Sequence, residues 1–302
     1  MKNGAKFHGA VVPMVTPVTT SGALDETAVD RLVDSLLAGG VAGIFVLGTT
    51  GEAMNVPRAF RRRLVERAAQ RAGGRCLIYA GLGDLKPDDF GTANEFLRAG
   101  ATAVVAHPPI STPVPAHELA AWYQALLAHL EGPLILYNIP ATTGVSIPLD
   151  TVEQLAAHPK VAGIKDSENN PQRHAELLKR FGGRPGFAVF IGVGALMAQG
   201  LKLGAEGIVP SVGNLIPDVC QNICASAERG DWNAVEQHAA RMNSVAALYQ
   251  KGRTLGQSLA ALKAALSARG LCAPNVLPPL QPLSKAEAES LRGEMSRLQL
   301  LR

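Results

Sequence analysis

The chain has 302 residues, of which 47% are hydrophobic, so it can bury a core large enough for one or two domains. Its formal net charge of +4 is spread along the chain, which excludes the dense basic surface of a nucleic-acid-binding protein. No apolar stretch reaches the roughly 18 residues of a membrane span, and the N-terminal segment MKNGAKFHGA lacks the apolar core of a signal peptide. These features predict an enzyme of the cytoplasm that contacts neither nucleic acid nor membrane.

Short apolar runs alternate with helical patterns from the N-terminus to about residue 230. We predict strands at residues 9–15, 43–47, 76–80, 103–106, 133–137, 161–165, 187–191 and 207–210. The intervening helices are predicted at residues 26–38, 57–72, 87–99, 116–130, 149–157, 171–181, 194–203 and 216–229. A helix that ends in glycine directly before a strand recurs three times, as in LLAGGVAGIFVLG at residues 36–48, which indicates a repeated unit.

Continuous apolar strands that alternate with helices are typical of a parallel sheet covered by helices. The repeated unit predicts an α/β fold, a closed (β/α)8 TIM barrel over residues 1–230, with an open doubly wound sheet as the alternative. After residue 230 the strands stop, and only helices are predicted, at residues 231–250, 255–269 and 284–298. We expect residues 231–302 to form a C-terminal helical region packed on the barrel.

Two groups of residues are predicted to be structural. The cysteines Cys76, Cys220, Cys224 and Cys272 lack the spacing of a metal site and are expected in the core. The arginines Arg58, Arg61, Arg62, Arg63 and Arg67 are expected on the solvated face of a helix.

Lys165 ends the apolar run Val161–Ile164 at the carboxyl end of a predicted strand, the edge where barrel enzymes place their chemistry. Strand alternation predicts that Val161, Gly163 and Lys165 face the barrel interior, while Ala162 and Ile164 face the helices. Burial lowers the pKa of a lysine amine, and a neutral amine is the nucleophile that forms a Schiff base with a ketone. Lys165 is therefore a candidate nucleophile, and a solvated lysine without chemical role is the alternative.

Two further strand ends carry suitable groups. The turn Gly48-Thr49-Thr50-Gly51-Glu52 offers two hydroxyls and several backbone N–H groups for a small carboxylate, unless it is an ordinary glycine turn. Tyr137 offers a phenol for proton transfer, unless it is only an aromatic residue at the rim. The coincidence of these groups with Lys165 on one edge of the barrel favours an active site.

The motifs GTTGE (48–52), YNIPATTG (137–144) and GIKDS (163–167) resemble those of the dihydrodipicolinate synthase / N-acetylneuraminate lyase family of class I, pyruvate-dependent aldolases. The resemblance covers nearly the whole chain. It implies a (β/α)8 barrel that uses no metal and no organic cofactor, and a homotetramer built as a dimer of dimers. It also implies pyruvate, or another 2-oxo acid, and an aldehyde as the small-molecule partners.

The resemblance assigns roles to individual residues. Lys165 would form the imine with pyruvate, and Tyr137 would shuttle protons to and from the substrate oxygen, with Thr50 as a candidate helper. The remaining positions would bind substrate: Thr49 and Thr50 the pyruvate carboxylate, Gly192 and Val209 the walls of the pyruvate pocket, and Ser211 a substrate hydroxyl.

Departures from the family pattern concern the second substrate. Thr142 stands where dihydrodipicolinate synthases carry an arginine for the semialdehyde carboxylate, and Ile110 stands where they carry a second tyrosine, lent by a neighbouring subunit. His107 could replace that tyrosine as acid or base, or be structural. Sialic-acid lyases carry an Asp-Glu pair for sugar hydroxyls where this chain has Gly194 and Ala195.

The residues and the resemblance together predict a class I lyase that cleaves a short 2-oxo-4-hydroxy or 2-oxo-3-deoxy acid to pyruvate and an aldehyde. The alternatives that use the same lysine imine are 4-hydroxy-tetrahydrodipicolinate synthase and a dehydratase of 2-oxo-3-deoxy sugar acids. An alternative of another class is a barrel that senses a 2-oxo acid without turnover.

Overall fold

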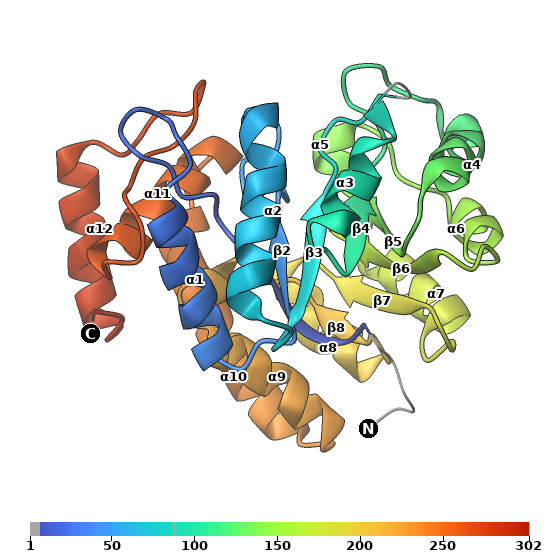
Figure 1. The fold of residues 1–302 in the computed structure, drawn as a ribbon. Helices are drawn as coiled ribbons and strands as arrows, with labels where there is room; N and C mark the ends of the chain where they lie inside the picture. The colour runs from blue at the N-terminus through green and yellow to red at the C-terminus, as the bar shows by residue number, and fades with distance from the viewer. Residues whose placement is uncertain (1–6, 87–88, 302) are drawn as a thin grey trace.

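The protein was analysed as a computed structural model that describes residues 7–86 and 89–301. Parallel strands form a closed barrel in which each strand pairs with the next along the chain and β8 pairs with β1 (Figure 1). The strands are β1 (Gly9–Pro13), β2 (Gly43–Val46), β3 (Leu77–Gly81), β4 (Ala103–Ala106), β5 (Leu134–Asn138), β6 (Val161–Asp166), β7 (Ala188–Ile191) and β8 (Gly207–Ile208). The predicted (β/α)8 barrel is confirmed, and the open sheet is excluded.

Helices cover the outside of the barrel. The α-helices are α1 (Glu26–Ala38), α2 (Arg58–Ala72), α3 (Thr92–Arg98), α4 (Leu119–His129), α5 (Pro140–Thr143), α6 (Leu149–Leu155), α7 (Pro171–Phe181), α8 (Met197–Lys202) and α9 (Pro217–Glu228). Short 3-10 turns form at η2 (Ala116–Glu118), η3 (Gly194–Leu196) and η4 (Ser211–Asn214). After α9 come α10 (Trp232–Gln250), α11 (Leu255–Ala268) and α12 (Lys285–Arg297), which lie together on one side of the barrel (Figure 1, orange to red).

Three predicted helices differ from the observed ones, and the one predicted at residues 116–130 begins with the 3-10 turn η2 before α4. The helix predicted at residues 87–99 is observed from Thr92, directly after Gly91, and its predicted residues 87 and 88 lie outside the described residues. The helix predicted at residues 194–203 consists of the 3-10 turn η3 followed by α8. Glycine at positions 91 and 194 accounts for the last two differences, because it disfavours an α-helix relative to other residues.

The arginines of α2 only partly follow the prediction of a solvated face. Arg63 pairs with Glu26 and Arg67 with Asp30, so α2 is bound to α1 by surface ion pairs. Arg61 instead lies half-buried and donates to the carbonyls of Val56 (2.9 Å) and Ala53 (3.0 Å). Arg61 therefore stabilises the loop after β2 and does not belong to the solvated face of α2.

The alternation predicted for β6 holds at its carboxyl end but is wrong at its start. Leu134 of β5 pairs with Val161, whereas Ile135 pairs with Gly163, so the register shifts between them. Val161 therefore packs in the core between strands and helices, and Ala162 packs inside the barrel. Such an irregularity redirects side chains locally. Beyond it, Lys165 lines a cavity of the barrel interior, as predicted.

Candidate active site

Lys165 lies inside the barrel near the carboxyl end of β6, with 6% of its surface exposed. Its Nζ is 3.9 Å from the ring centroid of Tyr137 and 5.1 Å from that of Phe45. Among residues 7–86 and 89–301, no carboxylate or carbonyl forms an ion pair or hydrogen bond with this amine. The surroundings of the Lys165 amine are therefore aromatic faces and not counter-charges.

Tyr137 is next to Lys165 across the sheet, because the two residues pair in the ladder between β5 and β6. The ring of Tyr137 is 3% exposed, and its hydroxyl lies 3.2 Å from Oγ1 of Thr49. The hydroxyl pair therefore connects the end of β5 with the loop after β2. This arrangement brings an amine, a phenol and a second hydroxyl together, the groups that a Schiff-base site requires.

The loop that carries Thr49 is held by backbone hydrogen bonds. Gly51 N–H donates to the Gly48 carbonyl (2.9 Å), and Glu52 N–H donates to the Thr49 carbonyl (3.1 Å). The hydroxyl of Thr16 donates to the Gly51 carbonyl (2.6 Å). Thr50 is half-buried in the same turn, and the hydroxyl beside Tyr137 is that of Thr49, not that of Thr50.

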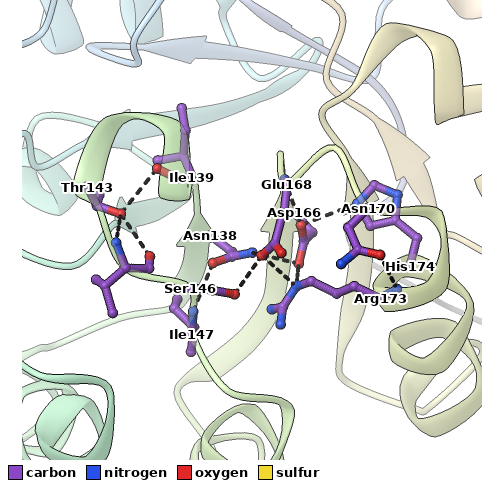
Figure 2. A network of polar contacts seen from close by, with 11 residues as sticks. Asn138, Ile139, Thr143, Ser146, Ile147, Asp166, Glu168, Asn170, Arg173 and His174 are labelled. Carbon is purple, nitrogen blue, oxygen red and sulfur yellow. Dashed lines mark hydrogen bonds and ion pairs between the residues drawn. The ribbon is translucent and has the colours of Figure 1, made fainter.

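A polar network joins the ends of β5 and β6 to α7 (Figure 2). Each of the two candidate catalytic residues is followed by a fully buried member of this network, Asn138 and Asp166. The amide of Asn138 donates to Asp166 Oδ2 (3.1 Å), and Arg173 Nε donates to the same oxygen (2.8 Å). This network fixes the ends of both strands and thus the distance between Tyr137 and Lys165.

Asp166 is ionised in this network despite its burial. Burial alone would raise the pKa of Asp166, but the hydrogen bond from His174 and the charge of Arg173 outweigh it and hold this pKa below its usual range. Glu168 extends the network by accepting hydrogen bonds from Asn138 (3.1 Å) and Ser146 (2.6 Å). The Asp166 carboxylate is therefore engaged by Asn138, Arg173 and His174 and does not pair with the Lys165 amine.

His107 lies at the end of β4, where its ring centroid is 6.1 Å from that of Tyr137. Its Nδ1 lies 2.7 Å from the Pro108 carbonyl, so this nitrogen carries the hydrogen and donates. Burial lowers the pKa of His107, against the opposing effects of the Pro108 carbonyl and of Asp84. At neutral pH His107 is therefore an uncharged imidazole whose other nitrogen can accept a proton.

Two cavities adjoin each other at the ring of Phe45. An inner cavity of about 10 Å³ is lined by Lys165 and Val209, and an outer pocket of about 140 Å³ is lined by Thr49, Tyr137 and Thr142. Phe45 and Val105 line both cavities. The inner cavity therefore adjoins Lys165 in the barrel interior, and it has room for about one water molecule.

Most of the predicted site residues therefore lie in one region. Gly192 is in contact range of the lysine, since a Cβ built on it would lie 3.1 Å from Lys165 Cε. Ser211 lies apart from the outer pocket and lines a groove between β7, β8 and α10 together with Gly192. Thr50 lines neither of the two cavities that meet at the rings.

Sequence reasoning missed the residues that hold the site. Asn138 and Asp166 were not singled out, although each directly follows a candidate catalytic residue on a strand. Their signal was available: a polar side chain that follows an inward-facing residue on a strand points to the opposite, helix-covered face. Burial there requires hydrogen-bonding partners, and α7 supplies them with Arg173 and His174.

Neither a metal-binding cluster nor a membrane-spanning helix is found in the described residues. No cluster of three or more His, Cys, Asp or Glu side chains with a geometry suited to a metal ion occurs in residues 7–86 and 89–301. In the same residues, no helix combines the length and apolar character that crossing a membrane would require.

Comparisons with known proteins agree with this geometry. The sequence profile of the Dihydrodipicolinate synthetase family matches residues 6–298. A 4-hydroxy-tetrahydrodipicolinate synthase from Thiobacillus denitrificans is 31% identical over 296 residues, which is 97% of this chain and 98% of the relative.

Solved structures are similar over the same length. The dihydrodipicolinate synthase of Bacteroides thetaiotaomicron superposes with a TM-score of 0.91 at 29% identity, over 97% of this chain and 99% of that one. YagE, a prophage protein of the dihydrodipicolinic acid synthase family from E. coli K12 solved in complex with pyruvate, superposes with a TM-score of 0.90 at 26% identity, with the same coverage.

Proposed function

Since the chain belongs to the dihydrodipicolinate synthetase family, a group of pyruvate-dependent lyases and synthases, we propose that it is a class I aldolase. Its substrate would be a short 2-oxo-4-hydroxy or 2-oxo-3-deoxy acid, which it cleaves reversibly to pyruvate and an aldehyde. The observation that carries the proposal is the buried Lys165 amine, which has aromatic neighbours and no counter-charge within the described part of the chain.

The reaction follows from the positions of three side chains. The Lys165 amine attacks the C2 ketone, and loss of water gives a protonated imine that acts as electron sink. Tyr137, hydrogen-bonded to Thr49, gives its proton to the hydroxyl that leaves as water when the imine forms. As the phenolate it then accepts the proton of the C4 hydroxyl while the C3–C4 bond breaks. The electrons of that bond form the enamine, and the aldehyde departs. Protonation of C3 by Tyr137 and hydrolysis of the imine then release pyruvate and the free amine.

The 2-oxo acid carboxylate would be bound by the loop Gly48–Glu52. Thr49 lines the outer pocket, and Thr50 follows it in the turn. Since the Gly51 and Glu52 N–H groups are bonded to carbonyls of the same loop, the two threonine hydroxyls are the groups proposed to bind the anion. Val209 would pack against the methyl or methylene group of the 2-oxo acid, because it lines the inner cavity together with Lys165.

A synthase that condenses pyruvate with aspartate semialdehyde is the second candidate, favoured by the activity for which the relative from Thiobacillus denitrificans is named. That reaction requires a cation for the semialdehyde carboxylate. The outer pocket is lined by Thr142 at the position of the family arginine, and no arginine or lysine is found among the described residues that line it. This composition favours the aldolase over the synthase, and the same imine would also serve a dehydratase.

The test is to trap the imine with borohydride in the presence of pyruvate and to map the adduct by peptide mass spectrometry. The proposal expects a stoichiometric adduct on Lys165 and release of pyruvate from one or more 2-oxo-3-deoxy acids. An adduct on another lysine, or tight pyruvate binding without turnover of any substrate, contradicts it. A cyclised product with aspartate semialdehyde would identify the synthase, and a dioxo acid would identify the dehydratase.

The homotetramer implied by the family resemblance forms part of the same proposal. Two large side chains at the mouth of the outer pocket, Met54 and Leu255, are 46% and 55% exposed, and exposed apolar groups at one place often mark an association surface. Light scattering that gives the mass of a single chain of 31.6 kDa would refute the assembly.

A further inference from the structure

The outer pocket over β2 to β5 has walls that are mostly apolar. Phe45 and Val105 line it from the barrel strands β2 and β4. Leu255 and Leu259 line it from α11, and Leu280 lines it from the loop between α11 and α12. Because Phe45, Val105 and Leu259 are buried, the packing of the core fixes these walls. The pocket therefore offers carbon surfaces to a substrate group that enters it.

Few polar side chains of the described residues line the same pocket, and several of them are bound to protein groups. The Glu52 carboxylate is fully buried in its ion pair with Lys263. The Thr49 hydroxyl lies 3.2 Å from that of Tyr137, and Nδ1 of His107 donates to a backbone carbonyl (2.7 Å). The polar groups that remain for a substrate are Nε2 of His107 and the side chains of Asn55 and Thr142. They can serve the single hydroxyl that an aldol addition creates at C4, whereas the leucines offer nothing to further hydroxyls.

The size of the pocket suits a compact apolar group. Its volume is about 140 Å³. An apolar protein cavity of about 150 Å³ that is lined by Leu, Ile and Phe binds benzene. The outer pocket therefore matches a six-membered carbon ring in both volume and wall chemistry.

Three side chains connect the outer pocket with the lysine. Phe45 and Val105 line both this pocket and the inner cavity beside Lys165. Tyr137 lines the outer pocket, and the centroid of its ring is 3.9 Å from Lys165 Nζ. Because Tyr137 is proposed to exchange the proton of the C4 hydroxyl, C4 of the bound substrate lies beside this phenol. The group that C4 carries then extends into the outer pocket.

We propose that the aldehyde partner is apolar and about as bulky as a six-membered carbon ring, and that Leu259 and Leu280 select it. The inference rests on the proposed aldolase function and names its substrate class. The acid chain itself stays short, with four carbons, and its C4 carries the apolar group. Burial of that group against the leucines is favourable, whereas a hydroxylated or charged group would lose its water there without gaining partners.

The experiment compares two aldehydes of the same shape in the synthetic direction with saturating pyruvate. Tetrahydropyran-4-carbaldehyde carries one ring oxygen where cyclohexanecarbaldehyde has a methylene group. We expect kcat/KM for cyclohexanecarbaldehyde to be higher by about 10-fold or more, because the ether oxygen would be buried without a hydrogen bond. It should also exceed kcat/KM for acetaldehyde by about 10- to 100-fold, since acetaldehyde leaves the apolar walls uncovered.

Two leucines of one loop provide the variant and its matched control. Leu280→Ala should lower the ratio of kcat/KM for cyclohexanecarbaldehyde to that for acetaldehyde by about 5-fold or more, because the ring loses apolar contact. Leu283 lies three positions further along the loop and packs against the core without lining the pocket. Leu283→Ala should therefore leave the ratio unchanged.

The proposal is wrong if the two ring aldehydes are used equally, or if tetrahydropyran-4-carbaldehyde or glyceraldehyde is preferred. An unchanged ratio in Leu280→Ala, or the same loss in Leu283→Ala, overturns the selection by the pocket leucines. Borohydride trapping of pyruvate on Lys165 separates these failures from failure of the aldolase function. Trapping without use of cyclohexanecarbaldehyde refutes only the aldehyde class, whereas absence of trapping in the wild-type protein refutes the function itself.

Discussion

Two lysines of this protein are almost fully removed from water, and their surroundings differ. Lys165 lies inside the barrel with its Nζ over the rings of Tyr137 and Phe45 and without a carboxylate partner in the described residues. Lys263, on α11, forms an ion pair with Glu52 in which both side chains are 0% exposed. The first lysine is surrounded by aromatic rings, and the second by oxygen atoms.

The second pair joins distant parts of the chain. Lys263 Nζ also donates to the Asn275 carbonyl (2.8 Å), and Glu52 Oε2 accepts from the Leu277 N–H (2.7 Å). Glu52 belongs to the loop that carries Thr49, so this ion pair binds the C-terminal region to the active-site loop. A buried charge is tolerated when it is paired and hydrogen-bonded, which is the condition that Lys263 meets and Lys165 does not.

The comparison indicates a division of labour. A fully paired lysine cannot attack a ketone without giving up its partners, so Lys263 serves structure. Lys165 has no such partners among the described residues, which leaves its amine free for the role of nucleophile proposed above. The following predictions test whether the two lysines differ in this way.

The largest effect is expected from Lys165→Met, which keeps the length of the side chain and removes the amine. Turnover should fall by about 10⁴-fold or more, as expected on loss of a covalent nucleophile. The free energy of unfolding should change by less than about 1 kcal/mol, because no ion pair is broken. Steady-state kinetics and urea unfolding measure the two quantities. A large loss of stability would show that Lys165 has a structural partner, and the comparison would fail.

Tyr137→Phe should have the next largest effect. It removes the hydroxyl that lies 3.2 Å from Thr49 and keeps the ring beside Lys165. We expect kcat to fall by about 10²- to 10⁴-fold, the range of general acid–base catalysis. Borohydride trapping should still label Lys165, but more slowly. Thr49→Val is the control for the hydroxyl pair, and a normal rate for Tyr137→Phe would assign proton transfer to another group, with His107 first to be examined.

The sequence allowed a prediction for Lys165 but not for Lys263. Lys165 could be found because it ends an apolar strand, where strand periodicity and the barrel rule give both its direction and its place. Lys263 lies on a helix, in the segment ALKAAL, and its partner lies 211 positions earlier in the chain. No local pattern reports a contact of that range, so helix periodicity could not separate it from a solvated lysine.

The same reason explains what else sequence reasoning could and could not reach. Periodicity predicted the barrel and most helix positions. The ends of the predicted strands indicated Tyr137 and Thr49 as candidates, and the family resemblance assigned their roles. The irregularity at Ala162 was not accessible, because a register shift depends on the neighbouring strand β5. The inward position of Arg61 likewise depends on carbonyls of a folded loop.

Lys263→Met should have the opposite effects to Lys165→Met: a large loss of stability and little change in imine formation. It leaves the Glu52 carboxylate buried without its cation, and breaking a buried pair in this way costs about 3–5 kcal/mol. Urea unfolding measures the loss, and trapping of the pyruvate imine on Lys165 should remain complete in the folded protein.

The double variant Glu52→Gln/Lys263→Met is the control for the pair. It should be less destabilised than the sum of the single variants, because the amide still accepts from Leu277 and no charge remains buried. An additive result would show that the two side chains do not interact.

The smallest effect is expected from Asp166→Asn, which tests the carboxylate next to Lys165 in sequence. The folded-state pKa of Asp166 is lowered, so its ionised form stabilises the protein above the unfolded pKa of about 3.9, and this contribution is lost as the pH falls through the folded value. At pH 7 the variant should lose about 1.5–3 kcal/mol, less than Lys263→Met because Glu168 remains 3.4 Å from Arg173. Unfolding free energies of the wild-type protein and the variant, measured from pH 7 to pH 2.5, should therefore converge below about pH 4.

If the difference stays constant with pH, Asp166 is not the charged partner of Arg173. If Asp166→Asn instead abolishes imine trapping, Lys165 depends on this carboxylate and the contrast between the two lysines no longer holds.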